Sequence, residues 1–114
     1  MIRSKPDYVF AYYSRGFAYH AIGKYDLAIE DYTEAIRIQP DDAEAYFLRG
    51  NTYLNKWEYN LAILDYTKVI HINPDYAEAY YQRGNSYRDK RVCRKLKRLV
   101  KLKLCYRHEV VKFC

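Results

Sequence analysis

Apolar residues recur along the chain at the spacing that places them on one face of an α-helix. In the segment 43–74 they form two such stripes, one over 46–54 and one over 59–70. The residues between the stripes, NKWEY (55–59), are few enough to force the two helices to run antiparallel. Pro74 ends the second helix, because proline lacks the amide that a helix interior needs. The pattern therefore predicts a helical hairpin in this segment.

The same pattern returns at a fixed period along the chain. Residues 9–42 and 43–76 are identical at 16 of 34 aligned positions, and residues 77–90 match 43–56 at nine of 14. A period of 34 residues marks a stacked repeat, in which each hairpin covers the apolar face of its neighbour. Small Gly50 and Ala62 stand where the two helices of a hairpin must approach closely, and the many tyrosines are expected to fill the gaps between helices.

The repeat stops abruptly, since residues 91–110 match 57–76 at none of 20 positions. Both ends of the chain look cut from a longer array, and a frameshift or a fused gene end would explain the loss of identity. We divide the chain into a lead-in resembling the end of a preceding repeat (1–8), repeat 1 (9–42), repeat 2 (43–76), the first helix of repeat 3 (77–90) and a divergent basic tail (91–114).

The motifs YYSRGFAY…AIEDY…P and YFLRGNTY…AILDY…P, with the half-copy YYQRGNSY, resemble the tetratricopeptide repeat (TPR). The resemblance covers residues 9–90 and implies an all-α fold, a solenoid in which antiparallel helix pairs form a right-handed superhelix. Arg15, Arg49 and Arg83 stand where the family usually has leucine. An arginine beside a helix contact is costly unless paired. We expect Asp31 and Asp65 to pair with the first two arginines, between hairpins. The position of a third aspartate holds Leu99, so Arg83 has no equivalent partner.

The resemblance also implies a binding site, because the first helices of this family line a concave groove that holds peptides or partner helices. Five aromatic residues at the groove positions would form an apolar strip, and Asn51 and Asn85 could bond a peptide backbone, which favours an apolar segment of a partner protein. Alternatively, the aromatics on the first helix are buried under a cap and the asparagines are solvated. The groove positions are Phe10, Tyr13, Phe17, His20, Glu44, Phe47, Asn51, Leu54, Glu78, Tyr81, Asn85 and Arg88.

One branch of the family binds acidic C-terminal tails of chaperones through a clamp of lysines, asparagines and an arginine. The matching positions in this chain contain no basic residue and no asparagine, so the sequence argues against such a clamp. They are Tyr13, Phe17, Leu48, Glu78 and Gln82.

The sequence offers no catalytic chemistry. It has no glycine-rich phosphate loop and no nucleophile set beside a base, and its three histidines are scattered. We therefore expect a non-enzymatic protein-interaction scaffold or adaptor with no cofactor. No apolar stretch approaches the ~20 residues that span a bilayer, and no secretory signal is visible, so we expect a cytoplasmic protein.

Positive charge is concentrated in the tail, because residues 88–114 hold 11 basic and two acidic side chains, whereas 1–87 hold nine and 12. The favoured interpretation is a degenerate second helix over 92–106 that covers the third hairpin. The alternative is binding of nucleic acid or an anionic membrane surface. The basic residues are Lys90, Arg91, Arg94, Lys95, Lys97, Arg98, Lys101 and Lys103.

The tail also holds all three cysteines, Cys93, Cys105 and Cys114, which with His108 could ligate zinc. Their spacing follows no usual pairing, so the sequence favours free thiols and no metal. If the tail covers the last hairpin poorly, exposed tyrosines would drive self-association, and a homodimer is then expected.

Overall fold

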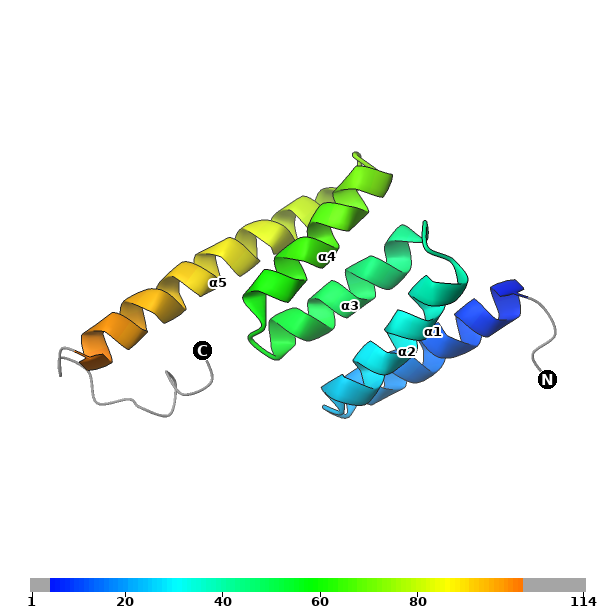
Figure 1. Cartoon of the computed structure of the whole chain (residues 1–114), viewed down its shortest axis with the longest axis horizontal. Helices are drawn as coiled ribbons and strands as arrows, with labels where there is room; N and C mark the ends of the chain where they lie inside the picture. Colours follow the sequence, from blue (N-terminus) through cyan, green and yellow to red (C-terminus); the bar gives the residue numbers. More distant parts are fainter. Residues whose placement is uncertain (1–4, 102–114) are drawn as a thin grey trace.

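The computed structural model describes residues 5–101, and this part of the chain is helical without a β-strand (Figure 1). Its first helix begins inside the predicted lead-in, where Pro6 is tolerated because the amides of a first helical turn have no partner within the helix. The elements are α1 (Lys5–Ala21), α2 (Tyr25–Ile38), α3 (Ala43–Asn55), α4 (Tyr59–Ile72) and α5 (Ala77–Lys101).

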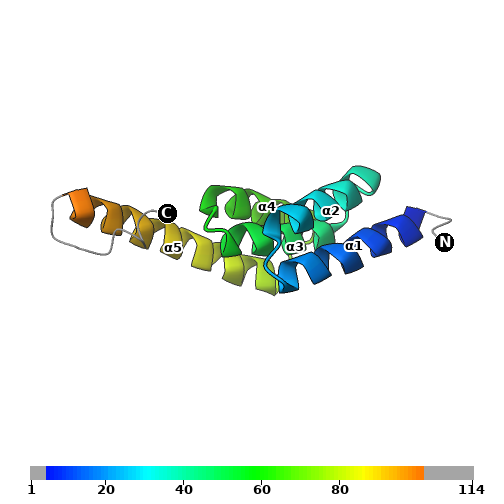
Figure 2. The same ribbon diagram turned by 90° about the horizontal axis from the view of Figure 1, so that it is seen from below.

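The five helices pack as neighbours in chain order. α1 pairs with α2 and α3 pairs with α4, while α2 contacts α3 and α4 contacts α5. Figure 2 shows two layers, with α1, α3 and α5 in one and α2 and α4 in the other. The all-α architecture of helical hairpins predicted from the sequence repeat is thereby confirmed.

Local backbone chemistry sets where the hairpins turn. Gly23 and Trp57, which occupy the same position in successive repeats, both adopt the left-handed conformation, with φ of 80° and 64°. Glycine takes this conformation without steric cost, whereas a tryptophan must be held there by its surroundings. Between the hairpins, the Asp42 side chain accepts a hydrogen bond from the Glu44 amide at 3.1 Å and caps the start of α3.

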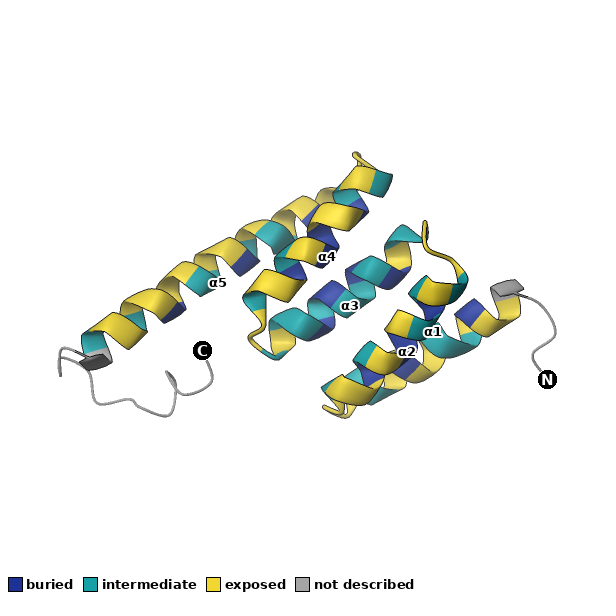
Figure 3. Cartoon of the chain, in the orientation of Figure 1, coloured by how far each residue is buried: buried dark blue, intermediate teal, exposed yellow. Residues whose placement is uncertain are grey.

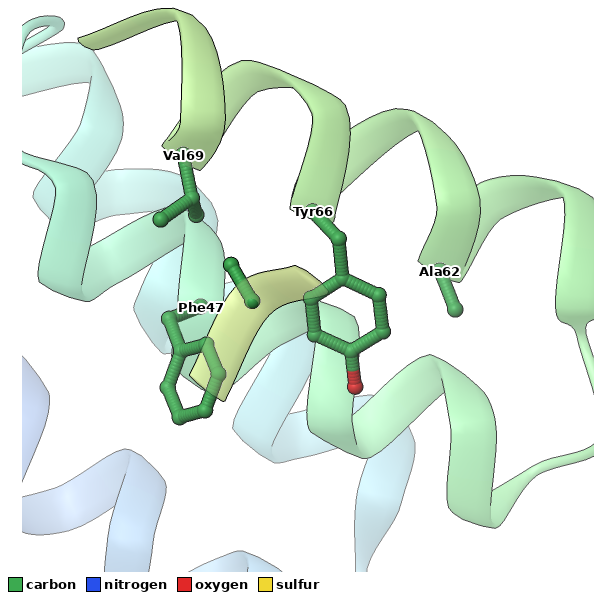
Figure 4. Packing of buried hydrophobic residues seen from close by; sticks show 5 residues of the cluster. Phe47, Ala62, Tyr66 and Val69 are labelled. Atoms are coloured by element: carbon green, nitrogen blue, oxygen red, sulfur yellow. The ribbon is translucent and has the colours of Figure 1, made fainter. Parts of the chain in front are cut away.

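The core lies between the two layers (Figures 3 and 4). One cluster joins α3, α4 and α5, and a smaller one, made of Val9, Ala35 and Ala45, joins the first hairpin to α3. Gly50 is buried against the Tyr66 ring, and a Cβ atom at this glycine would lie 2.9 Å from the ring carbon Cε1. The main cluster consists of Phe47, Ala62, Tyr66, Val69 and Ala79.

The divergent tail departs from the sequence prediction, because residues 92–101 do not form a separate helix that turns back. They continue α5 in a straight line as far as Lys101, and residues 102–106 of the predicted helix lie outside the described part. Arg91 occupies the position of the left-handed Gly23 and Trp57 but is helical. The segment after it consists mostly of the good helix formers leucine, lysine and arginine and has no glycine or proline, so nothing in it breaks the helix.

Cys93 anchors the second half of α5. It is buried, and its Sγ lies 3.6 Å from the hydroxyl of Tyr59 on α4. The expectation of free thiols is wrong at this residue, since Cys93 is disulfide-bonded.

Candidate functional site

The twelve predicted groove residues lie four each on α1, α3 and α5, the helices of one layer (Figure 2). We call the side of this layer that carries them the first-helix face. Successive first helices contact one another, α1 with α3 and α3 with α5. The face is therefore a continuous surface across the three repeats.

Three aromatic side chains stand out from this face. Phe10 is 70% exposed, Phe17 62% and Tyr81 70%. The first two lie on α1 about two turns apart, and Tyr81 lies on α5 at the other end of the layer. Glu44, Glu78 and Arg88 are also exposed. The face thus presents apolar rings at both ends with charged groups between and beside them.

The other two aromatics of the predicted strip belong to the packed structure. Phe47 is only 8% exposed because its ring packs against Tyr66 and Tyr76, with ring centroids 5.9 and 5.1 Å apart. Tyr13 is half-buried and donates a hydrogen bond to the carboxylate of Asp42, and burial together with this bond raises the pKa of its hydroxyl. The strip of five exposed aromatics is therefore reduced to three.

The two groove asparagines each keep one half of the amide available. The Oδ1 atom of Asn51 accepts a hydrogen bond from the Tyr66 hydroxyl at 2.6 Å, which leaves its NH₂ group as a donor. The Nδ2 atom of Asn85 donates to Gln82 at 3.1 Å, which leaves its carbonyl oxygen as an acceptor. Together they retain one donor and one acceptor for a bound main chain.

His20 closes the junction between α1 and α3. Its Nε2 atom lies 2.8 Å from the amide nitrogen of Asn55, and its Nδ1 atom lies 2.8 Å from the hydroxyl of Thr52. Because an amide NH₂ group donates, Nε2 accepts and the proton stays on Nδ1. Thr52 in turn donates to the carbonyl of Leu48. Burial lowers the pKa of His20, which favours this neutral ring.

The sequence predicted the correct aspartate partners for the repeated arginines, but it wrongly placed these pairs between hairpins. Arg15 binds Asp31, and Arg49 binds Asp65, within each hairpin rather than between hairpins. In both pairs the arginine lies on the first helix and the aspartate directly opposite on the second. Each pair therefore holds one hairpin closed.

The contact by which the arginines join one hairpin to the next was missed. Arg49 donates from Nη1 to the hydroxyl of Thr33 at 3.2 Å, and Arg83 donates to Thr67 in the same way at 3.2 Å. The signal was in the sequence, because Thr33 and Thr67 themselves occupy the same position in successive repeats. A threonine that recurs opposite a recurring arginine indicates a repeated interface contact.

The basic residues of the tail lie along the second half of α5. At 100° per residue, the six from Lys90 to Arg98 fall within an arc of about 160°, so they share one side of the helix. Five of them are exposed and Lys90 is half-buried. Lys101 ends α5, and Lys103 lies outside the described residues.

The chaperone-clamp positions hold no basic side chain, and two of them are engaged within the fold. Tyr13 is bonded to Asp42, and Gln82 accepts from Asn85. Phe17 and Glu78 are exposed. Within residues 5–101, no cluster of three metal-ligating side chains is found, and no helix has the length and apolarity to cross a membrane.

Comparison with known proteins supports the repeat assignment. A sequence profile described as TPR repeat matches residues 19–56 and 58–90, whereas no curated protein matches the sequence. The second TPR of Spaghetti (RPAP3), bound to the HSP90 peptide SRMEEVD, is 30% identical with a TM-score of 0.67, over 69% of this chain and 73% of that one. The second TPR domain of human RPAP3, in complex with the HSP70 peptide SGPTIEEVD, is 26% identical with a TM-score of 0.74, over 83% and 79%.

A third similar structure is that of the MamA protein, which is 31% identical with a TM-score of 0.71. The match covers 82% of this chain and 51% of the MamA chain, so this chain spans about half of that protein. The repeat profile matches more than half of the chain, from the end of α1 to the middle of α5. This chain belongs to the tetratricopeptide repeat family.

Proposed function

We propose that this chain is a non-enzymatic scaffold that binds a peptide or an extended segment of a partner protein on the first-helix face. The observation that carries the proposal is the exposure of Phe10, Phe17 and Tyr81 on one layer of helices. Aromatic side chains are enriched among the residues that supply most of the free energy of association at protein interfaces.

The chemistry of the face describes the ligand. Exposed rings at both ends fit apolar side chains, and the free halves of Asn51 and Asn85 fit the carbonyl and amide groups of an extended main chain. The RPAP3 domains, whose structures resemble this one, bind peptides, which supports a peptide ligand here. The absence of basic residues at the clamp positions points to a ligand other than an acidic terminus.

A peptide-display selection on the immobilised full chain tests the proposal. We expect the enriched peptides to carry apolar residues and to lose most of their affinity for a Phe17→Glu/Tyr81→Glu variant. Tyr80→Glu is the matched control, because Tyr80 is also exposed on α5 but lies outside the predicted groove set. Peptides that bind the wild type and the double variant equally would place the binding site elsewhere and refute the proposal.

The alternative is a module that acts through its basic end, either by binding nucleic acid or an anionic surface or by self-assembly. Its support is the six basic residues on one side of α5. Affinity for a single-stranded oligonucleotide should then fall steeply with salt, because binding releases counterions, whereas an apolar peptide on the first-helix face should tolerate salt. Light scattering of the full chain distinguishes self-assembly from both.

A further inference from the structure

One side of α5 carries the same residue types with which α1 packs against α2 and α3 packs against α4. We call this side the outer stripe of α5, and its residues are Tyr80, Arg83, Gly84 and Tyr87. Each lies 34 positions after a residue through which α3 contacts α4. These α3 residues are Tyr46, Arg49, Gly50 and Tyr53. α5, however, continues to Lys101, and within the described residues no second helix turns back along the stripe.

The glycine of the stripe shows most plainly what is missing. A Cβ atom at Gly16 would lie 2.8 Å from the Tyr32 ring, and one at Gly50 would lie 2.9 Å from the Tyr66 ring, so in both hairpins a tyrosine of the second helix fills the space above the glycine. At Gly84 a Cβ atom would meet no atom of the described residues within 4 Å. The third glycine leaves the same space open.

Arg83, the arginine of the stripe, makes one of the two kinds of contact that Arg49 makes. Arg49 bonds Thr33 in the preceding hairpin and, through Nε and Nη2, both carboxylate oxygens of Asp65 at 2.9 and 2.8 Å. Arg83 keeps the equivalent bond to Thr67. Within the described part of the chain no carboxylate takes the place of Asp65 beside Arg83, so this guanidinium is held in position to receive one.

The surroundings of the stripe define the charge of whatever covers it. Tyr80 and Tyr87 are 46% and 54% exposed. A hollow of about 380 Å³ opens beside Gly84, and most of its lining is basic. Further along α5, Arg91, Arg94 and Arg98 continue on the same side. The hollow is lined by Gly84, Tyr87, Arg88, Lys90, Arg91 and Arg94.

Residues 90–114 contain no Asp-Tyr pair that could take this place. After Asp89 the sequence contains no aspartate, and its single later carboxylate side chain is Glu109. A second copy would have to use Asp31 with Tyr32 or Asp65 with Tyr66, all of which are buried inside their own hairpins. Either pair could leave only if a complete hairpin opened.

We propose that the outer stripe of α5 binds an acidic amphipathic helix of another protein that carries an Asp-Tyr pair. The carboxylate accepts two hydrogen bonds from Arg83, and the tyrosine ring packs over Gly84, as Asp65 and Tyr66 do on α3. Further acidic residues of the helix face Arg91, Arg94 and Arg98. The partner thereby completes the third hairpin at a surface separate from the first-helix face.

A peptide cut from this chain serves as the probe. Residues 24–40, KYDLAIEDYTEAIRIQP, contain the Asp31-Tyr32 pair and have four acidic and two basic side chains. We expect the labelled peptide to bind the full chain in a fluorescence anisotropy titration. The control peptide exchanges the order of the pair (Asp31→Tyr/Tyr32→Asp), which keeps composition and charge, and should bind at least tenfold more weakly.

Variants of the full chain locate the binding. Gly84→Leu places a side chain in the open space, where a Cβ atom meets no described atom within 4 Å, and Arg83→Gln removes the charge. Each should weaken peptide binding at least tenfold. Tyr81→Ala, on the neighbouring side of α5, should leave it unchanged, although the same substitution weakens ligands of the first-helix face. This difference separates failure of the present proposal from failure of the proposed function.

Several results would overturn the proposal. They are absence of peptide binding, equal binding of the two peptides, and equal binding by Gly84→Leu and the wild type. A full chain that self-associates in light scattering, and becomes monomeric in Gly84→Leu, would assign the stripe to a second copy. A single-stranded oligonucleotide that displaces the peptide and binds more tightly would assign it to nucleic acid.

Discussion

The guanidinium of Arg49 and the carboxylate of Asp65 form a bidentate ion pair inside the second hairpin. Nε and Nη2 lie 2.9 and 2.8 Å from the two carboxylate oxygens, and the side chains are 18% and 7% exposed. Burial raises the pKa of Asp65, and the hydrogen bonds and charge of Arg49 oppose that shift. The pair replaces an apolar contact that the family usually makes with leucine.

Loss of one partner of such a pair leaves an uncompensated charge in the interior. Asp65→Ala should therefore destabilise the fold by about 3–5 kcal/mol. In the equivalent pair the side chain of Arg15 is 60% exposed, so solvent compensates its charge and Asp31→Ala should cost less. Urea unfolding followed by circular dichroism measures both variants. A smaller loss for Asp65→Ala than for Asp31→Ala would contradict this assignment.

The same substitution at two repeated glycines should have opposite effects. Gly50→Ala forces a Cβ atom against the buried Tyr66 ring, and such overpacking should destabilise the fold by about 1–3 kcal/mol. At Gly84 the added Cβ atom meets no described atom within 4 Å, and alanine is a better helix former than glycine, so Gly84→Ala should stabilise the fold by up to about 1 kcal/mol. Unfolding midpoints of the two variants decide the matter. Destabilisation by Gly84→Ala would show that its stripe is covered in the free protein.

The fold should lose stability in mild acid because of His20. Burial lowers the pKa of this histidine, so the folded state favours the neutral ring. The stabilisation it gives is present above the usual histidine pKa of about 6.5 and is lost as the pH falls through the lower pKa of the folded state. Thermal melts at several pH values between about 8 and about 5 should show this decline.

His20→Gln removes the titrating group and should flatten the decline. His71→Gln is the matched control, because His71 is exposed on α4 and makes no contact with the junction of α1 and α3. If His71→Gln flattened the melts and His20→Gln did not, the pH dependence would have another origin.

The HSP90 peptide SRMEEVD, which the second TPR of Spaghetti binds, should not bind this chain measurably. A terminal carboxylate and acidic side chains need several cationic donors, and the matching positions hold no basic residue and one amide, in Tyr13, Phe17, Leu48, Glu78 and Gln82. Isothermal titration calorimetry at low salt favours any electrostatic binding and is the strictest test. Micromolar binding would mean that other basic residues form the clamp.

The sequence predicts the hairpins well, because their signals are local. Gly50 and Ala62 mark a close approach of two helices, and the spacing of apolar positions fixes which sides of the helices meet. The partners of Arg15 and Arg49 also follow from the repeat. Whether the pairs lie within or between hairpins does not, since the same spacing fits both.

The errors fall where a distant residue decides the outcome. Phe47 occupies a groove position, but its exposure depends on Tyr76, which lies 29 residues later at the end of the repeat and packs against the ring. The course of α5 depends on a turn, and the apolar residues Cys93 and Leu96 fit a continued helix as well as a new one. Without a residue that adopts the left-handed conformation near Arg91, the helix continues.

Amide chemical shifts of the full chain, titrated with a peptide from the display selection, test the central claim most directly. A ligand on the first-helix face should perturb α1, α3 and α5 around Phe17, Asn51, Tyr81 and Asn85, with little change on the outer sides of α2 and α4. Perturbations confined to residues 90–101, or to the even-numbered helices, would contradict a scaffold that binds its partner on the first-helix face.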